Sequence, residues 1–357
     1  MSTILRQKSD FGKGKILKDD IQPVVVVYKE GIPNVVCFSN GEEANASCLR
    51  CHDAPCMNYK PEETLISTFP DFPADRSDEV CAAKAITREK DAGAPDIDTS
   101  LCMYCGVCAA RCPVGAIHMV PGKGAVLEDG SNKAFIETAN HPKEQMIAMR
   151  DKFAQVKRMG IHLTESDSLI SDLEGRLNRA AARIGDHFQN LLTRNLFVSV
   201  GIGAAMRRKG NNNMRMDLII GPPGAKHGVA EVEFGDEAIL DAPRDIMDDV
   251  AVLVARYGWV EKEIVAVVVG DIMPNRRSEY WRIIQDIGGV LGVRIGTISI
   301  LALLLANWNR MKLHLDPSNG FYADCDTGSY RTKVVEAMLG RALKLVPLPR
   351  SFVEPVK

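Results

Sequence analysis

Four closely spaced cysteines, in the run CMYCGVCAARCP from Cys102 to Pro113, constrain this chain more than any other feature of its sequence. Their spacing is C-x2-C-x2-C-x3-C-P, which is typical of loops that hold cubane iron–sulfur clusters. Three thiolates on one tight loop can cap three irons of a cubane, while the fourth, turned away by the start of a short helix, reaches a neighbouring cluster. The run therefore predicts a partner set of cysteines elsewhere in the chain.

The partner set lies upstream, in the stretches CLRCHDAPC and VCAAKAI. These stretches supply Cys48, Cys51, Cys56 and Cys81. Of the ten cysteines, only Cys37 and Cys325 fall outside the two sets, and we expect neither to be a ligand. Zinc and disulfides are the alternatives. All-cysteine zinc sites usually show two C-x2-C pairs. Disulfides are typical of secreted proteins, and the N-terminal residues lack the apolar stretch of a secretion signal.

This region resembles the two-cluster [4Fe–4S] ferredoxins over about residues 30–125. The resemblance implies two [4Fe–4S] clusters with crossed ligation. Cluster one would be held by Cys48, Cys51, Cys56 and Cys112, and cluster two by Cys81, Cys102, Cys105 and Cys108. The Pro- and Asp-rich segment between Cys56 and Cys81 is an insertion into the usual short ferredoxin loop, and we expect a surface loop there. Before the clusters, residues 23–41 predict a β-hairpin.

Downstream of the cysteines the pattern changes first to helices and then to alternating strands and helices. Helical periodicity covers roughly residues 140–197. Beyond it we predict strands over 214–221, 229–234, 263–274 and 296–309, and helices over 242–259 and 276–293. Because apolar strands separated by helices form sheets with helices on their faces, this half is predicted to be an α/β domain.

Three acidic residues fall on the first two of these strands. Asp217 lies on the first, while Glu231 and Glu233 lie two residues apart on the second, so both glutamates point to one face. If the strands form a hairpin, the three carboxylates meet, and they repel one another unless a cation joins them. Oxygen ligands of this kind suit Mg2+ or Mn2+. The alternative is the solvated face of an edge strand, where alternation alone explains the spacing.

With these acids the second half resembles the PD-(D/E)XK superfamily of restriction-endonuclease-like nucleases, over about residues 165–310. The resemblance implies catalytic roles for Asp217, Glu231 and Glu233, with the metal ion held by Asp217 and Glu231. Glu233 stands where most members have lysine, and Met216 where a proline is common. Family members often add an acid from the preceding helix, for which Glu174 and Asp186 are the candidates.

The predicted architecture is thus a multidomain α/β and α+β chain. A ferredoxin-like 2[4Fe–4S] domain with its N-terminal hairpin spans 1–135, and a helical linker spans 136–197. A restriction-endonuclease-like mixed sheet flanked by helices, with a C-terminal helix, spans 198–357. The most apolar run, Ile298–Ala306, is far shorter than the roughly 20 residues of a membrane span and is interpreted as a buried strand. We therefore expect a cytoplasmic protein without a membrane partner.

Three functions are compatible with these features. The first is an iron–sulfur-containing, metal-dependent endonuclease acting on nucleic acid, with DNA the favoured substrate and restriction or defence a plausible setting. Water activated near Glu233 would attack the phosphodiester, and a homodimer would allow both strands to be cut. The second is a ferredoxin-type electron-transfer protein with a redox partner, and the third a catalytically inactive nucleic-acid-binding module. Basic or aromatic candidates for phosphate contact are residues 207–213, Lys226, His227, Arg276, Arg277 and Tyr280.

Overall fold

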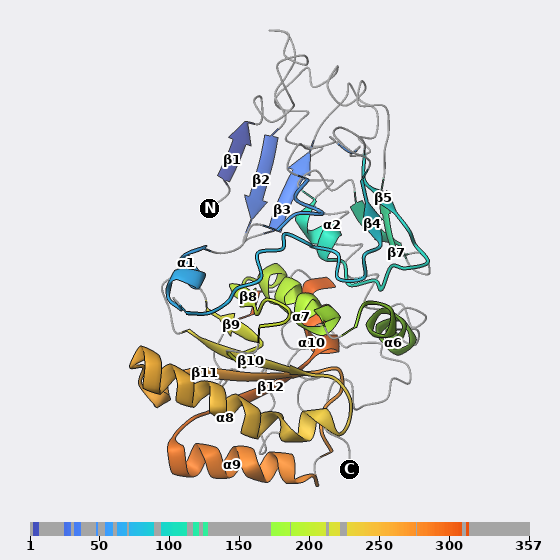
Figure 1. The fold of residues 1–357 in the computed structure, drawn as a ribbon. Coiled ribbons are helices and arrows are strands. Elements are labelled where there is room, and N and C mark those ends of the chain that lie inside the picture. Colours follow the sequence, from blue (N-terminus) through green and yellow to red (C-terminus); the bar gives the residue numbers. More distant parts are fainter. Residues whose placement is uncertain are drawn as a thin grey trace. The chain divides into compact units, whose positions relative to one another are not determined.

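The computed structural model describes part of the chain. The described ranges are residues 3–6, 25–29, 32–36, 48, 54–59, 63–69, 71–88, 94–112, 117–120, 124–127, 173–185, 187–211, 214–221, 227–275, 277–308 and 312–313. The chain divides into two compact units, each formed from separate segments of sequence. Unit 1 comprises Met1–Tyr59, Asp78–Ala180 and Trp308–Arg310; unit 2 comprises Lys60–Ser77, Ala181–Asn307 and Met311–Lys357. Figure 1 shows the elements of both.

Unit 1 is built from short elements. They are β1 (Thr3–Arg6), β2 (Val25–Lys29), β3 (Ile32–Val36), β4 (Ile86–Thr87), β5 (Asp96–Ile97), α2 (Val107–Arg111), β6 (Ile117–Val120) and β7 (Gly124–Leu127). The predicted hairpin is confirmed, because β2 and β3 pair antiparallel, and β1 adds a third strand to it. Two further antiparallel pairs, β4 with β5 and β6 with β7, flank the cysteine loop in sequence. The helix α6 (Leu173–Ile184) crosses the boundary between the units along the sequence.

Among its described residues, unit 2 holds one mixed five-stranded sheet. Its strands are β8 (Ala204–Met206), β9 (Leu218–Ile220), β10 (Gly228–Glu233), β11 (Val265–Gly270) and β12 (Ile295–Ser299). The spatial order is β12-β11-β10-β9-β8, so β10 is the central strand. β8, β9 and β10 pair antiparallel, whereas β10, β11 and β12 pair parallel through helical crossovers. The predicted hairpin of the two acidic strands and the α/β character are therefore confirmed.

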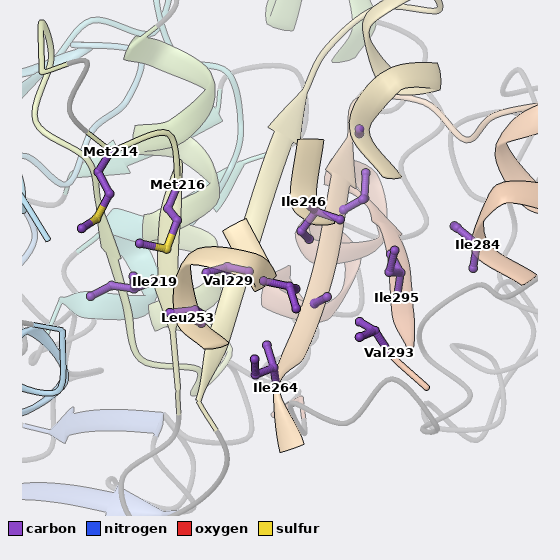
Figure 2. Close-up of a cluster of buried hydrophobic side chains, with 14 of the residues drawn as sticks. Met214, Met216, Ile219, Val229, Ile246, Leu253, Ile264, Ile284, Val293 and Ile295 are labelled. Carbon is purple, nitrogen blue, oxygen red and sulfur yellow. The ribbon is translucent and has the colours of Figure 1, made fainter. Parts of the chain in front are cut away.

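Helices cover both faces of this sheet. They are α1 (Glu63–Ser67), α7 (His187–Ser199), α8 (Ala238–Tyr257), the short 3-10 helix η1 (Glu261–Glu263), α9 (Glu279–Leu291) and α10 (Ile300–Trp308). α8 and α9 lie on one face, and α7 and α10 on the other (Figure 1). Figure 2 shows the core beneath α8 and α9, where Ile246 and Leu253 of α8 approach the sheet residues Val229 and Ile295. Burying each such side chain contributes about 1.5–3 kcal/mol, which fixes the helices on the sheet.

The prediction of a strand over residues 296–309 is wrong for the second half of that range. β12 ends at Ser299, and α10 begins immediately at Ile300 and contains most of the apolar run Ile298–Ala306. A short run of apolar residues fits a buried helix as well as a buried strand, so periodicity alone cannot separate them. Among the residues that the structure describes, no helix is both long and apolar enough to cross a bilayer.

The insertion between Cys56 and Cys81 is not the surface loop that its composition predicts. Its residues Lys60–Ser77 belong to unit 2. Within it, α1 and the turn that follows bury four apolar side chains in the core beneath α8: Leu65, Ile66, Phe69 and Phe72. We call Lys60–Ser77 the strap, because the chain leaves unit 1 to form it and then returns. Proline and aspartate at its turns obscured this apolar content in the sequence.

Candidate functional site

The cysteine loop in unit 1 owes its shape to two residues with left-handed backbone. Tyr104 has φ of 63° and Gly106 has φ of 75°, and α2 begins directly after Gly106. Left-handed backbone is unusual for tyrosine, so the surrounding structure must hold it. The loop thereby turns sharply between Cys102 and Cys108, and Cys112 caps α2 with its N–H bonded to the Cys108 carbonyl, at 2.9 Å.

The four cysteines predicted to hold cluster two lie close together. Burial raises the pKa of the Cys108 thiol well above its usual range, and negative charge on Cys105, Cys81 and Cys102 raises it further. Burial likewise raises the pKa of Cys105, with Cys81 the next cause. Buried thiolates this close to one another need a cationic partner to stay ionised. The donor set therefore fits an iron–sulfur cluster, in which the ferric and ferrous ions supply that charge.

Backbone N–H groups point at two of these sulfur atoms. Cys81 Sγ accepts the N–H of Ala85 at 3.2 Å, and Cys102 Sγ accepts that of Ala125 at 3.5 Å. A Cβ at Gly124 would lie 2.8 Å from Cys102 Sγ, so only glycine lets β7 approach the sulfur this closely. Hydrogen bonds to cluster sulfurs are one of the means by which proteins set cluster potentials.

The set predicted for cluster one is described in part. Cys48, Cys56 and Cys112 are buried, while Cys51 lies outside the described residues. The charge of Cys56 acts on Cys108 and on Arg111, which places Cys56 beside the second cysteine run. The assignment of these four residues to a second cluster stays a prediction.

An arginine contacts each of the two cysteine stretches within unit 1. Arg111 donates from Nε to the Pro55 carbonyl at 2.8 Å and from Nη2 to the Asn58 carbonyl at 3.0 Å. Arg176 donates from Nη1 to the Cys102 carbonyl at 2.8 Å, and its guanidinium lies 4.0 Å from the centre of the Tyr104 ring. Positive charge beside these loops favours ionised thiols.

In unit 2 the hairpin brings Asp217 and Glu231 together. The register pairs Leu218 with Ala230, so the residues preceding and following this pair, Asp217 and Glu231, lie opposite each other. Since β10 is the central strand and Glu231 is only 9% exposed, the alternative of a solvated edge strand is excluded. Glu233 is half-buried on the same face.

The carboxylate of Asp217 already has three protein partners. Its Oδ1 accepts from Asn190 Nδ2 at 3.0 Å and lies 3.3 Å from Arg207 Nη2, and its Oδ2 accepts from the N–H of Val232 at 3.3 Å. Asp217 therefore forms an ion pair in this structure, and its role as a metal ligand together with Glu231 stays a prediction.

The geometry also brings together a group of acids on β10 and on α8, the helix that covers it. Carboxylate oxygens of Glu231, Glu233 and Asp245 lie within 4.8 Å of one another. Asp249, one turn beyond Asp245 on α8, is 1% exposed and forms a side-chain hydrogen bond with Glu231. Its Oδ2 has no hydrogen-bond partner among the described residues. We call Glu231, Glu233, Asp245 and Asp249 the carboxylate group.

Burial and mutual repulsion shift these acids strongly. Burial first, then the charge of Asp217, raises the pKa of Glu231 to about 10. The same two causes raise the pKa of Glu233 to about 7 and that of Asp249 to about 7. The raised values mean that the negative charge here lacks sufficient compensation from protein cations. A hard divalent cation with oxygen ligands would supply it, and the donor set fits Mg2+ or Mn2+.

Sequence reasoning missed the two aspartates of α8 and the partners of Asp217. A signal for Asp249 exists, because it lies on the apolar side of α8 among Ile246, Val250 and Leu253. An acid on the buried stripe of a helix is costly without a partner. For the acid expected from the preceding helix, the side chain of Glu174 and all of Asp186 lie outside the described residues, and α7 supplies the amide of Asn190 instead.

The predicted phosphate-contacting residues have different fates. Arg207 pairs with Asp217, while its neighbours Arg208 and Lys209 are exposed. Tyr280 is unavailable for phosphate contact, because it is fully buried and bonded to Thr297 Oγ1 at 2.6 Å. His227 packs its ring against Trp259, with 5.9 Å between ring centres. Arg277 is exposed, and the residues outside the described part are Asn212, Asn213, Lys226 and Arg276.

The raised carboxyl pKa values predict a pH-dependent stability. Between the usual glutamate pKa of 4.5 and the folded value of about 7 at Glu233, the folded chain binds more protons than the unfolded chain. Stability of unit 2 should therefore fall, by about 2 kcal/mol, as pH rises from about 5 to about 8. Millimolar Mg2+ should flatten this slope. Thermal unfolding at several pH values, with Mg2+ and with a chelator, would measure it; a flat profile in chelator contradicts the prediction.

Comparison with known proteins bears on the cysteine region alone. A family model for a 4Fe-4S binding domain matches residues 95–118, which contain Cys102, Cys105, Cys108 and Cys112. The match supports the ferredoxin part of the interpretation and an iron–sulfur cluster in unit 1. No curated protein and no solved structure matches the chain.

Proposed function

We propose that this chain is an iron–sulfur protein whose unit 2 hydrolyses phosphodiester bonds of nucleic acid, with DNA the first substrate to test, using a divalent cation. The observation that carries the proposal is the convergence of Glu231, Glu233 and Asp245 within 4.8 Å on a central strand and its covering helix. A mixed sheet flanked by helices, with acids on both strands of its hairpin, is also what the nuclease resemblance implies.

The residues of the carboxylate group divide the work by their exposure. Glu231 is buried and Asp245 partly buried, and these two would hold Mg2+ or Mn2+ with Glu233. When bound, such a cation polarises a phosphoryl oxygen and lowers the pKa of water. Glu233 is the more open of the two glutamates on the strand, so its carboxylate would be the one to position or deprotonate the attacking water beside the cation.

The surroundings of the group are suited to an anionic substrate. Arg207 offsets the charge of Asp217, with 3.3 Å between Nη2 and Oδ1, which lowers the repulsion that a phosphate would meet. The exposed side chains of Arg208 and Lys209 follow directly on the chain and offer phosphate contacts that carry no sequence information. A homodimer would place two such sites on opposite strands of a duplex.

Two aspartates of α8 give a matched test of the proposal. Asp245 belongs to the carboxylate group, whereas Asp248 lies on the exposed side of the helix and pairs with Arg215 at 3.3 Å. We expect Asp245→Asn to lower Mg2+-dependent cleavage of plasmid DNA by about 10²-fold or more, because a ligand is lost, and Asp248→Asn to leave it within about twofold. Absence of cleavage in wild type with Mg2+ or Mn2+, or equal cleavage by both variants, overturns the proposal.

A second candidate function is electron transfer, and the family match over residues 95–118 is the observation that favours it. Arg176 beside Cys102 would raise the reduction potential of a bound cluster, because positive charge stabilises its more negative reduced form. Reversible one-electron reduction in a chain that does not cut nucleic acid would favour this candidate over the first.

A further inference from the structure

The strap, Lys60–Ser77, joins the iron–sulfur region to the edge of the sheet in unit 2 by an unusual route. The chain leaves unit 1 after Tyr59, three residues beyond Cys56, and returns at Asp78, three residues before Cys81. Both ends of the strap are therefore fixed next to cysteines that we expect to be cluster ligands. A change in the backbone at those cysteines would therefore act directly on the ends of the strap.

A short antiparallel neck in unit 1 closes the base of the strap. Tyr59 donates its N–H to the Asp78 carbonyl, and Val80 donates to the Met57 carbonyl at 2.9 Å. Arg111 fastens one side of this neck, because its guanidinium bonds to the carbonyls of Pro55 and Asn58, at 2.8 Å and 3.0 Å. Since Arg111 immediately precedes Cys112, the neck is fastened by a residue of the second cysteine run.

In unit 2 the first half of the strap is anchored by apolar contacts. Phe69 is fully buried, and its ring lies 5.0 Å from that of Trp259 and 5.8 Å from that of Tyr257. Leu65 and Ile66 of α1 belong to the same core. Burial of these side chains contributes several kcal/mol, so this half of the strap remains packed on the sheet whether or not the neck is fixed.

Beyond the buried Phe72, the second half of the strap is held mainly by polar contacts. On α7, His187 Nε2 lies 3.6 Å from Asp75 Oδ2, and Arg194 Nη1 donates to the Ser77 carbonyl at 2.9 Å, while Ala74 packs against the edge of the core. The backbone N–H of Asp75 donates to the Met206 carbonyl, and the backbone N–H of Arg208 donates to the Pro73 carbonyl, both at 2.8 Å. Ala74 and Arg207 form an antiparallel bridge between these two bonds. Each such bond has a net worth of about 0.5–1.5 kcal/mol, so the pairing of residues 73–75 with β8 opens more easily than the apolar contacts of the first half.

The bridge partner Arg207 is also the arginine that meets the acids. Its backbone N–H donates to the Asp217 carbonyl at 2.9 Å, and its Nη2 lies 3.3 Å from Asp217 Oδ1. Its Nη1 also donates to the Met214 carbonyl at 3.0 Å. Arg207 therefore lies between Ala74 of the strap, with which it forms the bridge, and Asp217, which lies opposite Glu231 in the sheet.

We infer that the strap makes Arg207 a positioning residue under the control of iron–sulfur cluster loading. With the cysteines loaded, the neck is fixed, residues 73–75 stay paired with β8, and Arg207 stays at Asp217. When the iron is lost, the neck loosens, the pairing with β8 opens, and Arg207 leaves Asp217. The inference rests on iron–sulfur binding and not on cleavage, and it involves loss or gain of iron ions rather than electron transfer.

The test compares hydrogen exchange in the full chain with its iron and after removal of the iron by a chelator with ferricyanide as oxidant. Iron content is measured in both samples. Peptides covering residues 71–77 and 204–211 report the strap and the edge, and β11 is the internal reference. We expect exchange in the first two peptides to rise about tenfold or more on iron loss, with β11 unchanged. Unchanged exchange at the strap, or an equal rise at β11, overturns the inference.

A pair of arginine variants separates the neck from the iron itself. Arg111→Met removes both bonds to the neck but keeps a side chain of similar length, whereas Arg179→Met alters an exposed arginine of α6 in the same unit. In the iron-loaded protein we expect hydrogen exchange at residues 71–77 to be faster in Arg111→Met than in wild type. We expect the exchange rate to be unchanged in Arg179→Met. Equal behaviour at matched iron content overturns the role of the neck. Because neither readout uses nucleic acid, failure here and failure of the nuclease proposal remain distinguishable.

Discussion

Replacement of Glu231 by glutamine is expected to remove Mg2+-dependent cleavage and to stabilise the fold in the same step. Glu231 lies on the central strand, is 9% exposed and has its pKa raised to about 10 by burial and by Asp217. The amide keeps the shape of the side chain but binds a divalent cation poorly. We therefore expect activity to fall by about 10²-fold or more.

The stability gain follows from the same burial. Without a cation, burial and the charges of Asp217, Asp249 and Glu233 raise the pKa of Glu231 to about 10, so this side chain must take up a proton when the chain folds at neutral pH. Glutamine is already neutral and removes that cost. We expect the free energy of unfolding in chelator to rise by about 1–3 kcal/mol. Chemical denaturation with and without Mg2+ measures both effects, and Glu263→Gln, at an exposed glutamate of η1, is the control. A variant that cuts as wild type does, or that is destabilised in chelator, contradicts the assigned role.

Replacement of Cys108 by alanine is expected to abolish iron binding at cluster two and to unfold its surroundings. The thiol is buried, and Cys81, Cys102 and Cys105 lie close enough to act on its charge. Where ligands come together only in the folded chain, metal binding and folding are one equilibrium, worth of order 10 kcal/mol in structural zinc sites. Visible absorbance, iron content and circular dichroism of the purified protein would show the loss.

Cys37→Ser and Cys325→Ser are the matched controls, because the sequence places both outside the ligand sets. Both positions lie outside the described residues, so the spacing alone supports this assignment. Each variant is expected to keep the iron content of wild type. Iron loss in either control, or full iron content in Cys108→Ala, would mean that the ligand sets are wrongly drawn.

The sequence pattern was sufficient to predict the acidic strand, its hairpin and the cysteine region, because each depends on residues close together along the chain. The alternation around Glu231 and Glu233 set the strand and its two faces, and the turn before it set the hairpin that places Asp217 opposite Glu231. The cysteine spacing led to the region that the 4Fe-4S family model matches. In each case the signal and the structure lie within a few residues of each other along the chain.

The features that the sequence did not reveal depend on distant packing. β12 ends at Ser299 and α10 begins at Ile300 within one apolar run. Whether such a run continues as a strand or turns into a helix depends on the space available beside the sheet. Asp245 and Asp249 join the acids because α8 crosses β10, which no spacing along the chain encodes. The resemblance directed attention to a preceding helix, whereas the following helix supplies the acids.

The strap has a consequence for how such a chain can be divided or inherited. Four apolar side chains beneath α8 are encoded ahead of Cys81, so a gene fragment that starts at residue 181 would leave a hollow on one face of the sheet. The halves are interleaved rather than joined end to end. Recombination at any single point between them would break one half, which ties the inheritance of the iron-binding part to that of the acidic sheet.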